Sequence, residues 1–126
     1  MNALAQAQKE IAADGGQIVA IMPERQQFAR ELKSETKAAF PILADIDNGY
    51  AMSLNLVFWV GSEMEGFIAK AGRDVPSYQG NKSWMFPVPA TFLVGRDQLI
   101  KARFVDPDYR KRMAIDDILQ ALRAAR

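Results

Sequence analysis

The chain has 126 residues, of which 49% are hydrophobic and 25% are charged, and its formal net charge at pH 7 is +1. This composition predicts one soluble globular domain, residues 1–126, with a core that needs no disulfides or metals. The balanced charge favours neither nucleic acid nor a membrane surface as a partner. No apolar run reaches the roughly 20 residues that cross a bilayer. The polar start is not a secretory signal, so we expect a cytoplasmic protein.

The sequence contains no cysteine and no histidine. A thiolate nucleophile, a redox disulfide, a Cys/His zinc site and a histidine-based triad are therefore excluded within these residues. Catalysis by this chain alone would require carboxylate, Lys, Tyr, Ser or Thr side chains, and no spacing of paired carboxylates stands out. We therefore predict no catalytic residue, no metal ligand and no cofactor.

The first third of the chain predicts a helix, a strand and a second helix. Residues 2–13 have helical periodicity, and the glycines at 15 and 16 end this helix. Residues 17–22 are almost continuously apolar, which is typical of a parallel strand covered on both faces. Pro23 suits the first turn of a helix that ends near Glu35. The apolar face of the first helix consists of Leu4, Ala7 and Ile11.

The middle of the chain predicts shorter elements and one long loop. An extended stretch at 40–44 and a helix at 50–54 precede an apolar strand at 56–60. Residues 62–71 predict a helix with one apolar face. Residues 73–89 lose all periodicity, so they predict a long loop, a feature that is more often functional than idle. The apolar face of the helix consists of Met64, Phe67, Ile68 and Ala71.

The last third predicts a hairpin and a helix. Residues 91–95 and 99–105 are strands joined by a turn. The alternation of helices and strands along the chain predicts an α/β fold: a layered, partly parallel sheet with flanking helices, finished by this antiparallel hairpin. The apolar stripe of the final helix consists of Ile115, Ile118, Leu119 and Leu122.

Four segments, taken in order, resemble the peroxiredoxin-like proteins of the AhpC/TSA (alkyl hydroperoxide reductase / thiol-specific antioxidant) family. They are residues 14–24, 40–45, 84–92 and 105–109, so the resemblance covers nearly the whole chain. The resemblance implies a thioredoxin-like fold. It also implies an antioxidant oxidoreductase that reduces hydroperoxides through a cysteine sulfenate, which a thiol donor then restores.

Proteins of this family begin earlier than this chain, with a strand and a Trp-Cys-Pro turn before the first helix. The resemblance places that strand between the counterparts of residues 17–22 and 91–95, so we expect an N-terminally truncated domain. Without that strand, its two neighbours would keep unpaired buried backbone groups, which are costly. Three alternatives would avoid this cost. A partner chain fills the position, residues 56–60 move into it, or the true gene product is longer.

The resemblance also implies site residues around the strand that begins at Thr91. Pro89 matches the proline that follows a cis peptide bond in this fold. It therefore predicts a cis bond between Val88 and Pro89, against the alternative of an ordinary trans proline entering a strand. Thr91 and Trp84 would line the adjoining groove. Many family members carry an arginine just before this strand, but here two prolines and Val88 occupy residues 87–89.

Aromatic residues provide a candidate interface. Phe58 and Trp59 are adjacent on a strand, so their side chains point to opposite faces, and one of them marks an interface unless both faces are covered. Trp84 and Phe86 either join this surface or cover the end of the sheet. We therefore expect a homodimer. A thiol reductant becomes a further partner if a longer, cysteine-bearing form exists.

Two charged segments each have two interpretations. Residues 45–49 either bind a cation or form a turn with side-chain caps, and the lack of a closing glutamate favours the turn. Residues 110–112, with Lys101 and Arg103, form a basic cluster. This cluster either binds an anion or nucleic acid or is solvated surface, which the balanced net charge favours.

These observations predict a peroxiredoxin-like domain that is inactive towards hydroperoxides as a cysteine-free chain. The alternative is a non-catalytic module that self-associates or binds a partner. A third hypothesis, a carboxylate-based or ligand-binding activity unrelated to the family, has no supporting residue spacing.

Overall fold

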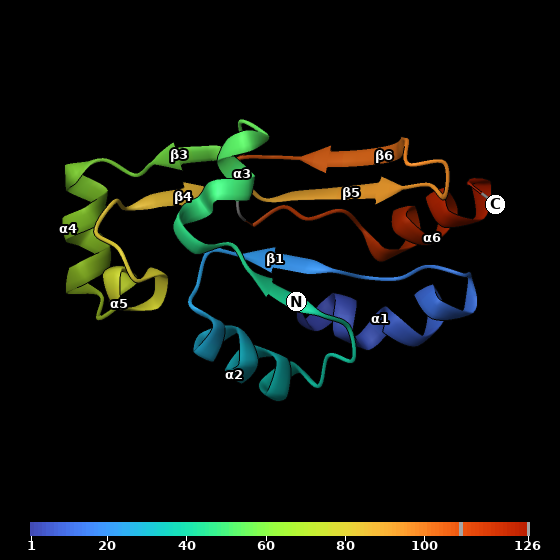
Figure 1. The fold of residues 1–126 in the computed structure, drawn as a ribbon, viewed down its shortest axis with the longest axis horizontal. Helices are drawn as coiled ribbons and strands as arrows, with labels where there is room; N and C mark the ends of the chain where they lie inside the picture. Colours follow the sequence, from blue (N-terminus) through green and yellow to red (C-terminus); the bar gives the residue numbers. More distant parts are fainter. Residues whose placement is uncertain (109, 126) are drawn as a thin grey trace.

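The computed structural model describes residues 1–108 and 110–125, and in it helices and short strands alternate (Figure 1). Tyr109, the last residue of the fourth resembling segment, lies outside the described residues. No described helix has both the length and the apolar character that crossing a lipid bilayer requires. The helices are α1 (Asn2–Ala13), α2 (Gln26–Thr36), the 3-10 turn η1 (Ile46–Asn48), α3 (Gly49–Ser53), α4 (Ser62–Lys70), α5 (Val75–Gln79) and α6 (Ile115–Ala124). The strands are β1 (Ala20–Met22), β2 (Ile42–Ala44), β3 (Val57–Trp59), β4 (Met85–Pro87), β5 (Ala90–Val94) and β6 (Ile100–Val105).

The main core lies between α1 and α6. Ile11 of α1 is 2% exposed and packs in one cluster with Ile118 and Leu119 of α6. At the surface, the Arg123 guanidinium of α6 donates a 2.9 Å hydrogen bond to the carboxylate of Asp14, which follows α1. The apolar faces predicted for these two helices are therefore confirmed, and each helix buries its face against the other.

The β1–β2 pair is parallel and is covered on one face. Ala20 and Ile42 lie opposite each other and pack against the buried Phe40. Ile21 and Leu43, the pair that points to the other face, are 46% and 51% exposed. The prediction of a strand covered on both faces is wrong for β1, because no described element covers these two side chains.

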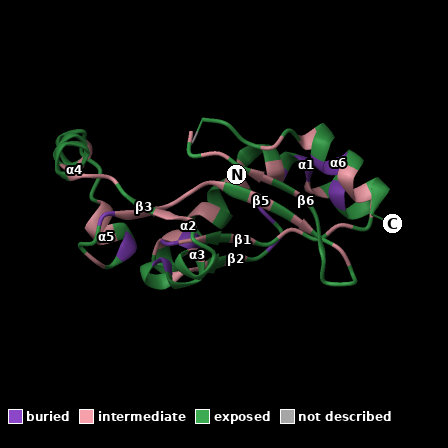
Figure 2. Ribbon diagram, turned by 90° about the horizontal axis from the view of Figure 1, so that it is seen from above, coloured by how far each residue is buried: buried purple, intermediate pink, exposed green. Residues whose placement is uncertain are grey.

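The strands form three two-stranded sheets and not one continuous sheet. β3 pairs with β4, and β5 pairs with β6 in the predicted antiparallel hairpin. Figures 1 and 2 show β1 beside β5, yet these two strands are not paired. Among the described residues, no strand lies between them, as expected. The alternative in which residues 56–60 move into this position is wrong, because β3 pairs with β4 instead.

The segment predicted to be a long loop contains two regular elements, α5 and β4. Asp74 caps α5 by accepting a 3.2 Å hydrogen bond from the Ser77 N–H. The buried side-chain amides of Asn48 and Gln79 donate to the Met85 carbonyl oxygen at 3.0 and 3.2 Å. The loop prediction is wrong because contacts between separate segments hold this region, and such contacts leave no periodic pattern in the sequence.

Helix α4 forms as predicted, but its apolar face is not buried. Met64 is 50% exposed and Phe67 is 70% exposed. In both ribbon views α4 lies at one end of the molecule, away from α1 and α6 (Figures 1 and 2). Helical periodicity identified the element correctly, whereas burial depended on neighbouring elements that do not cover it in the described part of the chain.

Candidate functional site

The residues singled out around Pro89 lie in the short link between β4 and β5. The Val88 N–H donates a 2.7 Å hydrogen bond to the Leu56 carbonyl oxygen, which extends the β3–β4 ladder. The Pro89 carbonyl oxygen accepts a 3.3 Å hydrogen bond from the Asp106 N–H, which extends the β5–β6 ladder. Two antiparallel pairs therefore meet at this link, and its backbone is held on both sides.

The peptide bond between Val88 and Pro89 is trans, since the described residues contain no cis peptide bond. The predicted cis bond is therefore wrong. A cis proline typically serves a tight turn, whereas here the chain passes from one strand directly into the next. The trans form of an X–Pro bond is also favoured intrinsically by about 0.5–1 kcal/mol.

Trp84 and Thr91, the other two predicted groove residues, lie in different surroundings. Trp84 is only 7% exposed and borders a small cavity with Ala69 of α4 and Pro76 of α5. Thr91 is half-buried in β5, opposite Phe104 of β6. Because Trp84 belongs to the packed interior, it covers the end of the structure and is not part of an exposed interface.

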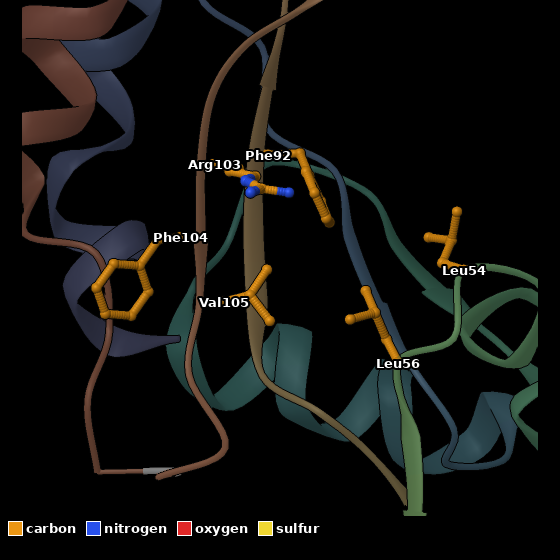
Figure 3. Close-up of a pocket in the computed structure, with 6 residues that line it drawn as sticks. All are labelled: Leu54, Leu56, Phe92, Arg103, Phe104 and Val105. Atoms are coloured by element: carbon orange, nitrogen blue, oxygen red, sulfur yellow. The ribbon is translucent and has the colours of Figure 1, made fainter.

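A larger cavity, of about 630 Å³, opens elsewhere in the molecule. Leu54 and Leu56, which follow α3, lie across from Phe92 and Val105 of the β5–β6 hairpin (Figure 3). The guanidinium of Arg103, the cross-strand partner of Phe92, lies beside the Phe92 ring. None of the four predicted groove residues lines this cavity, and its lining side chains are apolar apart from the single arginine.

Sequence analysis missed this cavity, although part of the signal is present in the period-two pattern of the hairpin. Phe92 and Val94 on β5, and Arg103 and Val105 on β6, alternate with more buried side chains. The hairpin register then places Phe92 opposite Arg103. The opposite wall comes from a segment more than 30 positions away, and no local pattern could have brought it to this place.

Three aromatic residues form a second candidate surface on β3 and β4. Phe58 is 39% exposed and Trp59 is 58% exposed, so neither face of β3 is fully covered. Phe86 lies opposite Phe58, and their rings meet edge to face with centroids 6.0 Å apart. We call Phe58, Trp59 and Phe86 the aromatic surface. Phe58 and Phe86 lie on one face of the β3–β4 pair and Trp59 lies on the other, and Trp84 is not part of this set.

The acidic segment at residues 45–49 forms a capped turn. The two carboxylate oxygens of Asp45 accept hydrogen bonds from the backbone N–H groups of Tyr50 and Ala51 at 2.8 and 2.9 Å. Asp47 accepts a 2.8 Å hydrogen bond from the Asn81 side chain. The turn interpretation is confirmed, since these oxygens already serve the backbone. The described residues contain no group of three His, Cys, Asp or Glu side chains that could hold a metal ion.

The basic residues lie at the surface, and among them Lys101 and Arg110 form ion pairs. The Lys101 ammonium lies 2.6 Å from Asp97. Its hydrogen bond lowers the pKa of Asp97, and the Leu99 backbone N–H adds to this effect. Arg110 binds Asp108 at 2.9 Å, and this guanidinium lowers the pKa of the Asp108 carboxyl. These exposed pairs fit the predicted solvated surface and do not converge on a common anion site.

Comparison with known proteins places this geometry in a family. The AhpC/TSA family model matches residues 1–103. The chain also resembles the crystal structure of a cysteine-to-serine mutant of peroxiredoxin 6 of Arenicola marina, with a TM-score of 0.66 and 16% identity. This likeness covers 96% of the present chain and 50% of the peroxiredoxin chain. A comparison with curated proteins finds no match.

The structural likeness shows a thioredoxin-like α/β fold, and the chain spans half the length of the peroxiredoxin that it resembles. The match to the family model extends from the first residue through β5 and into β6. It therefore includes the segment around Pro89 and most of the cavity wall. Because this match spans most of the chain, the protein belongs to the AhpC/TSA family.

Proposed function

We propose that this chain provides the scaffold of a thiol-dependent hydroperoxide reductase, and that its own side chains do not reduce hydroperoxides. The family match over residues 1–103 and the peroxiredoxin-like fold support the first part. The absence of cysteine from all 126 residues carries the second part.

The second part follows from the chemistry of peroxide reduction. A thiolate attacks one peroxide oxygen and the O–O bond breaks. The sulfur becomes a sulfenic acid, and the other oxygen leaves as water or an alcohol. A thiol reductant then returns the sulfenic acid to the thiol. Hydroxyl, amine and carboxylate groups have no such reversible oxidised state. The six methionines can form sulfoxides, but these need a dedicated reductase.

The purified chain is expected to consume hydrogen peroxide or cumene hydroperoxide, with dithiothreitol as reductant, no faster than a heat-denatured sample. Peroxide concentration would be followed over time at several protein concentrations, with a cysteine-dependent peroxidase as positive control. A rate that rises in proportion to the native chain would contradict the predicted inactivity.

The scaffold part of the proposal has its own test. A chain extended before Met1 by a strand and a Trp-Cys-Pro turn is expected to gain thiol-dependent turnover, because the extension supplies the missing nucleophile. The matched control carries Trp-Ser-Pro in the same extension and is expected to remain inactive. A folded cysteine-bearing extension without turnover would argue against the scaffold and would leave the inactivity of the 126-residue chain unaffected.

A second candidate function is self-association through the aromatic surface, favoured by the exposure of Phe58 and Trp59. Aromatic side chains often anchor protein interfaces. In this proposal two copies form a homodimer through the face of the β3–β4 pair that carries Trp59. The aromatic contact needs no sulfur chemistry, so the proposal stands independently of the peroxidase scaffold.

Sedimentation velocity over a range of concentrations is expected to show a reversible dimer, and Trp59→Lys to weaken it by at least about tenfold, or 1.4 kcal/mol. The matched control is Tyr50→Lys, because Tyr50 is 55% exposed on α3 and lies outside the aromatic surface. A wild-type chain that remains monomeric at every concentration would exclude this function. Equal weakening by both substitutions would also count against the aromatic surface.

A further inference from the structure

Asn48 lies at the junction of η1 and α3 and is fully buried, with an exposed fraction of 0%. Its side-chain Nδ2 donates a 3.0 Å hydrogen bond to the Met85 carbonyl oxygen of β4. Its Oδ1 is buried and has no hydrogen-bond partner among the described residues. The side chain is therefore anchored through its nitrogen alone, and this one bond joins η1 to β4 across 37 positions of the chain.

The residue after Asn48 is Gly49, and the backbone at this position does not require glycine. Gly49 has φ −59° and ψ −45°, which is the right-handed helical region that any residue adopts. A Cβ atom here would meet the Asp45 carboxylate at 3.9 Å, which is an ordinary contact. Alanine would therefore fit. What glycine contributes at this position is chemical, because it leaves the backbone nitrogen beside the Asn48 side chain unhindered.

A backbone nitrogen that follows asparagine is a nucleophile towards the asparagine side chain. Here the Gly49 nitrogen would bond to Asn48 Cγ, and the Cγ–Nδ2 bond would break. The proton lost by the Gly49 nitrogen leaves with Nδ2 as ammonia, and a five-membered succinimide ring remains. Water then opens this ring at either carbonyl carbon and leaves aspartate or isoaspartate. The reaction needs no oxidant, reductant or cofactor.

The folded turn holds both reacting groups in place. The Gly49 N–H donates to the Ile46 carbonyl oxygen, so the attacking nitrogen is already engaged. The leaving nitrogen of Asn48 is buried and bound to Met85. The Asp45 carboxylate also fixes two further backbone N–H groups at the start of α3. The ring therefore cannot close until this turn opens and separates from β4.

We propose that Asn48–Gly49 is a deamidation site that the fold keeps closed and that reacts when this turn opens. Segments held by a few hydrogen bonds open locally more often than the whole domain unfolds. Each reaction releases ammonia, and the chain cannot restore the amide by itself. The modification would therefore record past opening of the turn. The proposal requires no peroxide chemistry, so it stands apart from the proposed function.

The product of the reaction does not fit the folded turn. A carboxylate at residue 48 only accepts hydrogen bonds, and one of its oxygens would replace Nδ2 and face the Met85 carbonyl oxygen, another acceptor. A buried charge without a partner is costly. Isoaspartate would also lengthen the main chain by one carbon, at a residue with φ 57° and ψ 29°. Deamidation is therefore expected to weaken the contact between η1 and β4.

The test follows the modification of the whole chain by mass spectrometry. The chain is incubated in mildly alkaline buffer, with and without guanidinium chloride, and digested with trypsin. The peptide of residues 38–70 reports the replacement of NH2 by OH, and fragmentation locates it at Asn48. Deamidation is expected to be at least about tenfold slower in the folded chain than in the denatured chain. Equal rates would overturn the protection by the fold.

Gly49→Ala is the matched variant, because it keeps the backbone conformation and adds one methyl group beside the attacking nitrogen. Circular dichroism is expected to show the helix content of the wild type. In guanidinium chloride, Asn48 of this variant is expected to deamidate at least about tenfold more slowly than in the wild type. If both denatured chains reacted at the same rate, the site assigned to Asn48–Gly49 would be overturned.

The consequence of the modification has a separate test. Ion-exchange chromatography separates deamidated from unmodified wild-type chains, because the product carries one more negative charge. After removal of denaturant, the ratio of folded to unfolded chain is expected to be at least about tenfold lower for the deamidated form. Gly49→Ala is expected to refold fully after the same incubation. Equal unfolding midpoints for the deamidated and unmodified chains would contradict the expected loss.

Asn48→Asp provides one of the two products in pure form. It is expected to show the same loss of stability, or not to fold. A variant as stable as the wild type would contradict the misfit assigned to the carboxylate. The comparison of deamidation rates between the wild type and Gly49→Ala tests the site itself and needs no folded variant of residue 48.

Discussion

Replacing Trp84 with alanine is expected to lower the free energy of unfolding by about 3–5 kcal/mol, the usual cost of removing a buried large aromatic side chain. Trp84 is 7% exposed and borders a cavity that residues of α4 and α5 also line. Small domains unfold with about 5–15 kcal/mol in total. The loss would therefore remove a large part of the stability, and urea denaturation followed by circular dichroism would measure it.

The second tryptophan of the chain is a matched control for this prediction. Trp59 is 58% exposed, so Trp59→Ala is expected to change the free energy of unfolding by less than about 0.5 kcal/mol. Measurements at low protein concentration would keep any self-association from contributing. Similar losses from both substitutions would contradict the assignment of Trp84 to the interior and of Trp59 to the surface.

Replacing Ile11 with alanine is expected to cost about 2–5 kcal/mol of stability, because the side chain is 2% exposed and joins α1 to α6. The cavity left behind would lie between two helices that both depend on this contact. Thermal and urea unfolding would measure the effect, and loss of helical signal at 222 nm would report both helices together.

The same substitution at Ile21 provides the control and also examines the exposed face of β1. Ile21 is 46% exposed on β1, so Ile21→Ala is expected to cost clearly less than Ile11→Ala. If Ile21→Ala cost as much as Ile11→Ala, then the open face of β1 would be covered in solution. That result would contradict the exposure of Ile21 on β1.

Elements whose residues repeat with a local period were predictable from the sequence. The final helix was expected from Ile115, Ile118, Leu119 and Leu122, and it forms as α6. The hairpin was expected from two short apolar runs around residues 96–98, and it forms as β5 and β6. In both cases neighbours in sequence determine which side chains share a face, so the pattern is visible before folding.

Elements held by distant partners were not predictable in this way. Strand β4 has three residues and pairs with β3, about 28 positions earlier in the chain. Its first residue, Met85, receives a hydrogen bond from Asn48, 37 positions away. The trans geometry at Pro89 depends on the same pairing, because the two ladders that meet there keep the link extended.

The candidate site also has one part that was predictable from local sequence patterns and one part that depends on distant contacts. The interface prediction for Phe58 and Trp59 used strand alternation, and both remain exposed on the two faces of β3, whereas Trp84 is buried beside a cavity that residues of α4 and α5 also line. The cavity around Phe92 and Arg103 combines a local hairpin register with a wall from the segment after α3. Only the first of these contributions can be read from neighbouring residues.

The sequence by itself determined the chemistry that is absent, because a chain without cysteine has no thiolate whatever its fold. It also determined the family resemblance and the periodic helices, since both depend on the order of residues. Only the tertiary structure decided that β3 pairs with β4 and does not fill the position between β1 and β5. The physical reason is that backbone N–H and C=O groups are the same in every residue except proline. Which of them remain unpaired is therefore set by the spatial arrangement of the strands.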